Sequence, residues 1–314
     1  MSALDDTAYE LVVTRRTEDA DGVALIELES ATDRPLPRWQ PGAHIDVLLP
    51  NGDARQYSLS GTPGSPTWRI GVLREDLGRG GSVWIHDHAV EGATLRVAGP
   101  RNHFEFSADR GTRYLFIAGG IGITPILPMA AGLARDGADW TMTYAVRDEA
   151  HLPFRAEIAD LGPAVTIATR DTGRLDIAAL LSAPRPGVAV YACGPARFVE
   201  GVIEAMSAWP GGSLHLERFE PKPVVARPNV AFTVHCVRSD VVVEVPADRP
   251  MLQALTARDL PVSGSCLRGV CGSCAVRVLH GDVEHRDSLT VDPDSTTMYP
   301  CVSRAAGPEL VIDL

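Results

Sequence analysis

Four cysteines in the last fifth of the chain restrict its fold more than any other feature. Cys266, Cys271 and Cys274 follow one another with the spacing C-x4-C-x2-C, and Cys301 stands apart from them. Three clustered thiolates with a distant fourth are the ligand pattern of a plant-type [2Fe-2S] cluster. Structural zinc sites usually present two closely spaced cysteine pairs, and disulfides belong to oxidising compartments. The spacing therefore predicts an iron–sulfur cluster, with zinc as the alternative.

The residues around these cysteines predict an α+β domain over 229–314. A loop that wraps a compact inorganic core needs small residues, and the loop contains several glycines and serines. A hairpin is expected over 230–236 and 241–245, a helix over 251–258, and strands over 275–279 and 309–313. Val230, Phe232, Val234 and Cys236 are expected to share one buried face of the first strand. This order of elements is typical of the β-grasp plan.

Composition restricts the class of partner. The chain has 314 residues, which is more than one core usually serves, so two or three domains are expected. Its formal net charge of −11 argues against nucleic acid and anionic membrane surfaces and favours a basic protein partner. No apolar run reaches the ~18 residues of a spanning helix, and the first residues lack a basic segment typical of a secretion signal. We expect a cytoplasmic protein.

Residues 8–106 contain short strands separated by Gly, Pro and Asn/Asp turns, which predicts an antiparallel β-barrel. Within it, Arg55 and Tyr57 are expected on one face of a strand and Ser58 on the other. The glycine-rich stretch 78–82, which contains Arg79, precedes a helix predicted over 82–88. A glycine turn at a helix start is typical of a phosphate site, although an ordinary loop can have the same sequence.

Residues 112–219 alternate buried strands with helices, which predicts a parallel α/β sheet. The apolar run 114–118 leads into a Gly-Gly-Ile-Gly-Ile-Thr-Pro turn and a helix, the arrangement of a βα phosphate-binding unit. Thr124 is expected to cap this helix and Pro125 to occupy its first turn. Arg147, Asp171 and the stretch 193–195 follow later strands at the edge where ligands bind.

A proline-rich stretch divides the chain between these modules. The predicted divisions are a barrel over 1–107, a nucleotide-binding domain over 108–220, a linker over 221–228 and the cluster domain over 229–314.

The order of barrel, nucleotide domain and plant-type ferredoxin resembles the phthalate dioxygenase reductase family, which includes the reductase component of vanillate demethylase. The resemblance covers the whole chain. It implies FMN, NADH and [2Fe-2S] as cofactors, bound in that order along the sequence by a flavin barrel, a ferredoxin reductase-like α/β domain and a β-grasp domain. It also implies an NADH-dependent reductase that serves a Rieske-type aromatic oxygenase or O-demethylase.

Site residues follow from the resemblance position by position. Tyr57 would contact the isoalloxazine ring, Ser58 would lie near flavin N5, and Phe219 would be the aromatic side chain close to the flavin. The remaining FMN positions are Arg55, Val72, Leu73, Arg74, Arg79, Gly80, Gly81 and Ser82. The NADH positions are Gly120, Gly122, Thr124, Arg147, Asp171, Cys193, Gly194 and Pro195.

Two of these assignments have an open alternative. Ser58, Cys193 and Phe219 would act at the flavin, but Cys193 also fits a buried core thiol. Arg170 stands where this family often has His and would favour a 2′-phosphate, whereas Asp171 suits a ribose 2′-OH; NADH is therefore expected. No catalytic histidine is needed, and His285 is expected to be structural.

The expected reaction joins two-electron and one-electron chemistry. NADH delivers a hydride, which carries two electrons, whereas a cluster accepts single electrons. A flavin between them takes up the pair and passes the electrons on one at a time. A cytochrome P450 in place of the Rieske oxygenase is the close alternative. A redox sensor or interaction module built on a four-cysteine zinc site is the alternative of a different class.

Overall fold

The computed structural model describes residues 8–32, 34–222, 226–290 and 294–314. The chain divides into two compact units, one formed by Tyr9–Phe219 and the other containing Glu220–Leu314. The predicted barrel and nucleotide domain thus share one unit. The predicted linker, 221–228, lies near the start of the second unit, one residue after the boundary, and its residues 223–225 lie outside the described ranges.

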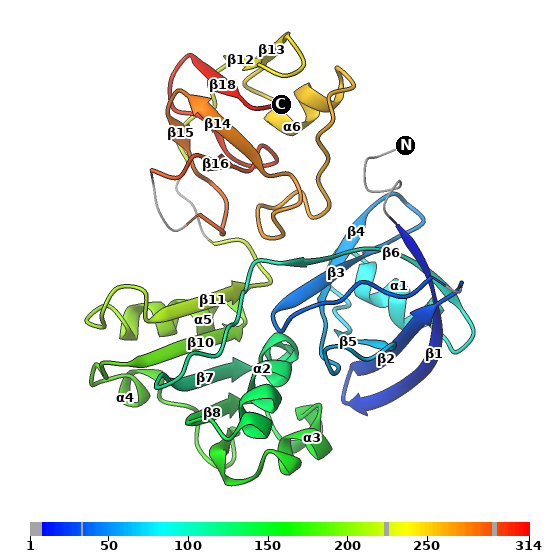
Figure 1. The fold of residues 1–314 in the computed structure, drawn as a ribbon, viewed down its shortest axis with the longest axis vertical. Helices are drawn as coiled ribbons and strands as arrows, with labels where there is room; N and C mark the ends of the chain where they lie inside the picture. Colours follow the sequence, from blue (N-terminus) through cyan, green and yellow to red (C-terminus); the bar gives the residue numbers. More distant parts are fainter. Residues whose placement is uncertain (1–7, 33, 223–225, 291–293) are drawn as a thin grey trace. The chain divides into compact units, whose positions relative to one another are not determined.

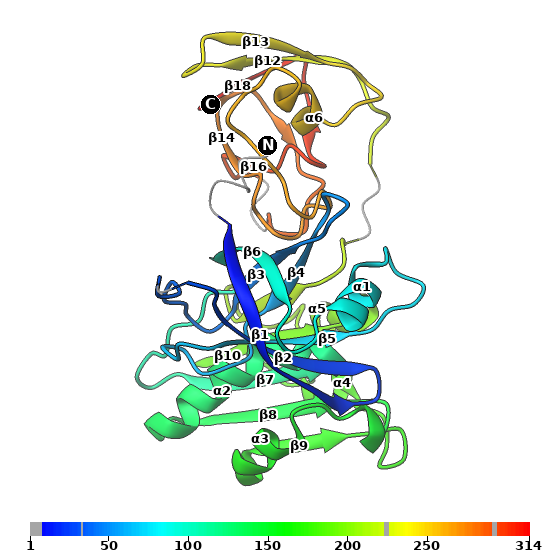
Figure 2. The same cartoon turned by 90° about the vertical axis from the view of Figure 1, so that its right-hand side faces the viewer.

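A six-stranded antiparallel sheet forms the first half of the larger unit (Figure 2). Its strand order is β4-β3-β6-β1-β2-β5, and the edge strands are brought together by a bridge between Leu59 and Ile70. The side chains of Ile26, Ile45 and Trp68 are fully buried within it. The elements are β1 (Tyr9–Ala20), β2 (Val23–Ser30), β3 (Ala43–Leu48), β4 (Ala54–Ser58), β5 (Trp68–Leu73), α1 (Gly81–His88) and β6 (Thr94–Asn102).

A five-stranded parallel sheet of order β11-β10-β7-β8-β9 forms the second half, and Figure 1 shows helices on its two sides. Tyr114 and Phe116 of β7 pack into one apolar cluster with residues of α2, whereas Leu115 and Ile117 pack into another with Val202 of α5. This alternation explains the continuous apolar run of the strand. The elements are β7 (Arg113–Gly119), α2 (Ile123–Asp136), β8 (Trp140–Ala145), α3 (Arg155–Asp160), β9 (Val165–Ala168), α4 (Ile177–Leu180), β10 (Val188–Gly194), α5 (Ala196–Ala205) and β11 (Leu214–Arg218).

Specific contacts join the two sheets of this unit. The backbone N–H of Phe154 donates to the carboxylate of Asp19 at 2.5 Å, and Arg69 of β5 forms an ion pair with Glu157 of α3 at 2.6 Å. Gly71 lets β5 approach the start of α2 closely, because a Cβ at this position would lie 2.9 Å from Cγ2 of Thr124. The glycine turn before α2 is therefore held against the barrel.

The Glu220–Leu314 unit has a mixed sheet of order β13-β12-β18-β14-β16, with β12 and β18 parallel. Phe232, Val234 and Cys236 are buried on one face of β12, as the sequence predicts. Figure 2 shows this sheet together with its helix α6. The elements are β12 (Phe232–Cys236), β13 (Val241–Val245), α6 (Met251–Thr256), β14 (Val276–His280), β15 (Val283–Glu284), β16 (Thr297–Met298), β17 (Arg304–Ala305) and β18 (Glu309–Ile312).

Two local predictions are wrong. Thr124 does not cap α2: a 3-10 turn at Gly120–Gly122 already leads into the helix, so Thr124 lies in the first helical turn and its hydroxyl donates to the carbonyl of Ile121 at 2.9 Å. Val230 is 72% exposed, because β12 begins only at Phe232.

Across the described ranges, every helix is too short or too polar to cross a membrane.

Candidate active site

The four predicted cluster ligands come together as buried, unoxidised thiols. Cys266, Cys271, Cys274 and Cys301 are each less than a tenth exposed, and none forms a disulfide. The backbone N–H of Arg268 donates to Sγ of Cys266 at 3.3 Å, and the Ser273 hydroxyl lies 3.2 Å from Sγ of Cys271.

The sulfurs form two pairs. A hydrogen bond with Cys271 lowers the pKa of Cys266 to about 6, with backbone amides adding to the effect, and a hydrogen bond with Cys301 lowers the pKa of Cys274. Each pair thus contains one thiol with a lowered pKa and a partner, Cys271 or Cys301, whose pKa is raised by the same hydrogen bond and by burial. Two pairs of thiols fit the donor set of a two-iron cluster, which takes two protein ligands on each iron. Within the described ranges, no three or more His, Cys, Asp or Glu side chains surround a position for a single metal ion.

Asp287 supports the cluster loop, and the sequence reasoning did not select it. Its carboxylate is fully buried and accepts hydrogen bonds from the backbone of Leu289 and Thr290 and from the Ser303 hydroxyl. A Cβ on Gly269, where φ is +67°, would lie 2.9 Å from this aspartate. Asp287 therefore fixes the segment against which the loop packs.

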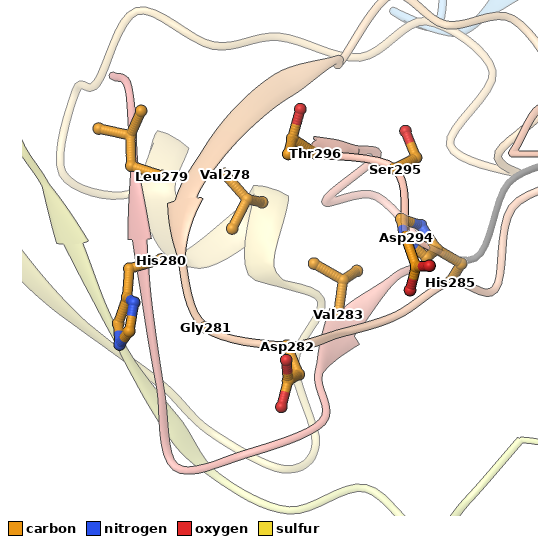
Figure 3. A pocket seen from close by; sticks show the side chains of 10 residues that line it. All are labelled: Val278, Leu279, His280, Gly281, Asp282, Val283, His285, Asp294, Ser295 and Thr296. Atoms are coloured by element: carbon orange, nitrogen blue, oxygen red, sulfur yellow. The ribbon is translucent and has the colours of Figure 1, made fainter.

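A pocket of about 400 Å³ lies in the same unit (Figure 3). His285 lines it, together with residues of the stretches 278–283 and 294–296. Nδ1 of His285 lies 3.6 Å from Asp287 and 3.3 Å from the Thr290 hydroxyl, which is consistent with the predicted structural role. None of the four cysteines lines this pocket.

The predicted FMN-phosphate residues meet at the start of α1. The guanidinium of Arg55 donates to the carbonyl of Arg79 at 2.9 Å, and a Cβ on Gly81 would lie 2.5 Å from the Arg55 side chain. Gly80 precedes the helix with φ of +76°, and no atom lies within 4 Å of the place its Cβ would take. The space beside Gly80, at the start of this eight-residue helix, is therefore open, and an uncapped helix start with a guanidinium nearby fits a phosphate.

The neighbouring FMN positions have mixed surroundings. Val72 of β5 is fully buried, and its carbonyl lies 2.9 Å from Nε2 of His86. Arg74 is paired with Asp76 and Asp87, both at 2.9 Å. The Ser82 hydroxyl accepts the backbone N–H of Glu75 at 3.0 Å, which ties the strand to the helix. Burial raises the pKa of Tyr57, so its hydroxyl stays protonated. Leu73 ends β5 and is half-buried.

The predicted nucleotide turn lies against the predicted nicotinamide stretch. A Cβ on Gly122 would lie 2.4 Å from the carbonyl oxygen of Cys193, so only glycine fits there. Gly194 is similarly close to Phe198 and Gly119. Pro195 precedes α5 and accepts backbone hydrogen bonds from its first turn. Gly120, with φ of +53°, has no atom within 4 Å of its Cβ position, which leaves space for a ligand.

Glu217 of β11 links the two halves, and the sequence reasoning missed it. The Ser58 hydroxyl donates to its carboxylate at 3.4 Å, and Sγ of Cys193 lies 4.0 Å from the same oxygen. Burial raises the pKa of Glu217 to about 8, although part of its surface is exposed, and the Ser58 hydrogen bond opposes the effect. The site thus holds a largely neutral carboxyl at pH 7 beside a hydroxyl and a fully buried thiol.

Three of the predicted site residues lie away from the contact between Ser58, Cys193 and Glu217. Arg147 and Asp171 are exposed at the carboxyl edge of the parallel sheet, where the backbone of Arg170 donates to the carbonyl of Arg147 at 3.1 Å. Phe219 is 38% exposed at the end of the larger unit.

Comparison with known proteins decides the family. A family model for the 2Fe-2S iron-sulfur cluster binding domain matches residues 234–306. The chain is 38% identical to the phthalate 4,5-dioxygenase oxygenase reductase subunit of Pseudomonas putida, over 99% of this chain and 98% of the relative. It is 37% identical to the vanillate O-demethylase oxidoreductase of Pseudomonas putida, over 97% and 99%. The chain belongs to the phthalate dioxygenase reductase family.

Solved structures agree with this family. Phthalate dioxygenase reductase, described as transferring electrons from pyridine nucleotides to [2Fe-2S], matches with a TM-score of 0.71 and 34% identity over the whole of both chains. An intact type IV self-sufficient cytochrome P450 monooxygenase matches with a TM-score of 0.91 and 40% identity, over 98% of this chain but only 41% of that one.

Family membership confirms the main predictions. The three-part fold, the NAD(P)H-dependent flavin and iron–sulfur reductase, and the cofactor set of FMN, NADH and [2Fe-2S] agree with the relatives and with the matched domain. The chain is thus a reductase component of a multicomponent oxygenase. The zinc module and the non-enzymatic sensor are not supported. The role of each site residue stays a prediction.

Proposed function

We propose that this member of the phthalate dioxygenase reductase family passes electrons from NADH through FMN and the [2Fe-2S] cluster to a Rieske-type oxygenase or O-demethylase that acts on an aromatic compound. The observation that carries the proposal is the meeting of Ser58 from the barrel with Cys193 from the parallel sheet at Glu217. A residue of the predicted flavin site and one of the predicted nicotinamide site thus contact the same carboxyl group.

The phosphate of FMN is assigned to the start of α1. The first N–H groups of the helix would bind its oxygens, with Arg79, Gly80, Gly81 and Ser82 forming the turn. Arg55 supplies positive charge and holds the turn through the carbonyl of Arg79. Tyr57, Val72, Leu73 and Arg74 are assigned to the surroundings of the ring.

The nucleotide residues would orient NADH. The open side of Gly120 and the close approach of Gly122 to Cys193 support a pyrophosphate at the turn before α2, with Thr124 beside it. Arg147 and Asp171 are assigned to the adenosine end. Cys193, Gly194 and Pro195 are assigned to the nicotinamide end, and Phe219 to the flavin side.

Bound FMN would accept a hydride and release its electrons singly. The protein groups position the partners. The pKa of Cys193 is raised well above its usual value, chiefly by burial, so its thiol stays neutral and acts by contact rather than as a nucleophile. The raised pKa of Glu217, about 8, favours a protonated carboxyl at neutral pH, which can hold a proton next to the Ser58 hydroxyl.

A second partner class rests on a specific observation. The P450 monooxygenase that matches with a TM-score of 0.91 has a segment like this whole chain, which supports a cytochrome P450 as acceptor. Turnover with a purified Rieske oxygenase and a purified P450 would separate the two. Four thiols assigned to an iron–sulfur cluster rather than to disulfides favour the cytoplasm as the compartment.

Anaerobic titration with NADH tests the electron path. The purified chain should contain one FMN, two iron atoms and two sulfides, and NADH should bleach both chromophores. Cys271→Ser should remove reduction of cytochrome c, a one-electron acceptor, and spare bleaching of the flavin. Zinc in place of iron and sulfide, or equal loss of both reactions in the variant, would contradict the proposal.

A further inference from the structure

His44 of β3 has a buried ring nitrogen without a partner. The residue is 5% exposed, and its Nε2 makes no hydrogen bond within the described structure. Leaving a buried polar group unpaired costs free energy, and most such groups in folded proteins have a partner. An orphaned nitrogen at this position therefore points to a ligand that supplies the missing bond.

The register places His44 beside Ser58. The two residues are directly opposite on β3 and β4, and the N–H of Leu59 donates to the carbonyl of Ala43 at 2.8 Å. This hydrogen bond makes His44 and Ser58 a non-hydrogen-bonded pair, in which opposite side chains share a face and approach most closely. Ser58 in turn reaches Glu217. The imidazole thus lies next to the group that joins the two halves of the unit.

The surroundings keep this ring neutral. Burial, then Arg101, then His103 lower the pKa of His44 to about 3. Arg101 is opposite His44 on β6 and forms an ion pair with the fully buried Asp46, and the His103 ring centre lies 6.1 Å away. A neutral imidazole has one N–H donor. An isoalloxazine edge carries carbonyl oxygens and unprotonated ring nitrogens, so a donor suits it.

We propose that His44 contacts the flavin, with Nε2–H donating a hydrogen bond to an acceptor atom on the isoalloxazine edge that faces Ser58. The inference rests on the proposed flavin site and extends it beyond the Arg-Gln-Tyr-Ser stretch to the neighbouring strand. It gives His44 two effects: it holds the ring in place, and it stabilises the negative charge that the ring gains on reduction.

The test measures FMN affinity and flavin potential in the intact chain. His44→Phe keeps a ring but loses the donor, and FMN added to the flavin-free protein should bind about tenfold more weakly. The FMN midpoint potential should become more negative. His44→Gln, whose amide can donate from a similar position, should recover most of the affinity. His88→Phe is the matched control, because His88 stacks on Trp84 at the far end of α1, and it should bind FMN normally.

Several results would overturn the proposal. His44→Phe could bind FMN as tightly as wild type, or His44→Gln could be as weak as His44→Phe. A lower melting temperature of flavin-free His44→Phe that accounts for the weaker binding would show a packing role instead; His44→Leu replaces this variant if it does not fold. A wild-type chain that binds no FMN would overturn the proposed function as well, so the two failures are distinguishable.

Discussion

Replacing Glu217 with Gln should change how the stability of the larger unit depends on pH. The carboxyl has a pKa of about 8 in the folded chain and an ordinary value of 4.5. Between these values the folded state binds a proton that the unfolded state lacks, so stability falls as pH rises. The contribution is fully present below pH 4.5 and lost above pH 8. Glu217→Gln carries no ionisable proton and should lack this dependence.

The size of the effect follows from the same two values. A pKa difference from 4.5 to about 8 corresponds to at most roughly 5 kcal/mol. Part of the Glu217 surface is exposed, and solvent around the charged form reduces this figure. We therefore expect wild type to lose about 2 to 3 kcal/mol relative to Glu217→Gln between pH 5 and pH 8.

Tryptophan fluorescence makes the measurement specific. All five tryptophans of the chain lie within Tyr9–Phe219, so their signal in guanidinium chloride follows the unit that contains Glu217. The unfolding free energy of both proteins is measured at half-unit steps from pH 5 to pH 9. A difference between them that stays constant over this range would refute the reasoning, because it would mean that Glu217 ionises normally.

Two further predictions concern the cofactor sites. Arg55→Ala should weaken FMN binding by roughly 10- to 100-fold, because a charged hydrogen-bond donor next to the phosphate turn is lost; dialysis followed by flavin extraction measures this, and unchanged occupancy would remove Arg55 from the site. Asp171→Asn should raise the ratio of kcat/KM for NADPH over NADH by about tenfold, since a carboxylate next to Arg170 no longer repels a 2′-phosphate; an unchanged ratio would place the adenosine ribose elsewhere.

Features with a local cause could be predicted from the sequence. The spacing of Cys266, Cys271 and Cys274 could be interpreted because all three lie in one loop. The glycine turn after β7 could be recognised because it leads directly into one helix. The apolar run 114–118 predicted a strand buried on both faces, and Tyr114 and Leu115 do pack into different clusters. Each of these signals lies within a few neighbouring residues, where side-chain periodicity and turn chemistry act directly.

Features that depend on residues far apart in the chain could not be predicted from the sequence. Glu217 lies in the sequence Leu-His-Leu-Glu-Arg, which resembles an ordinary strand with alternating polar residues. Its high pKa arises from burial of the carboxyl group, and the Ser58 hydroxyl that opposes this shift comes from 159 residues earlier in the chain. The Thr124 prediction failed for a local reason instead: the 3-10 turn at Gly120–Gly122 starts the helical geometry earlier than a capping pattern indicates.

The unit Tyr9–Phe219 and the unit that contains Glu220–Leu314 have separate apolar cores, so substitutions in one unit should affect the other little. The Ser58, Cys193 and Glu217 group exists only because two sheets share one unit, held by contacts such as Phe154 to Asp19 and Arg69 to Glu157. The four cysteines predicted to bind the cluster belong to another unit, with its own apolar cluster. Substitutions at the cysteines should therefore leave the tryptophan-monitored unfolding of the larger unit unchanged. Loss of the Arg69 ion pair should instead disturb the flavin and nucleotide residues together.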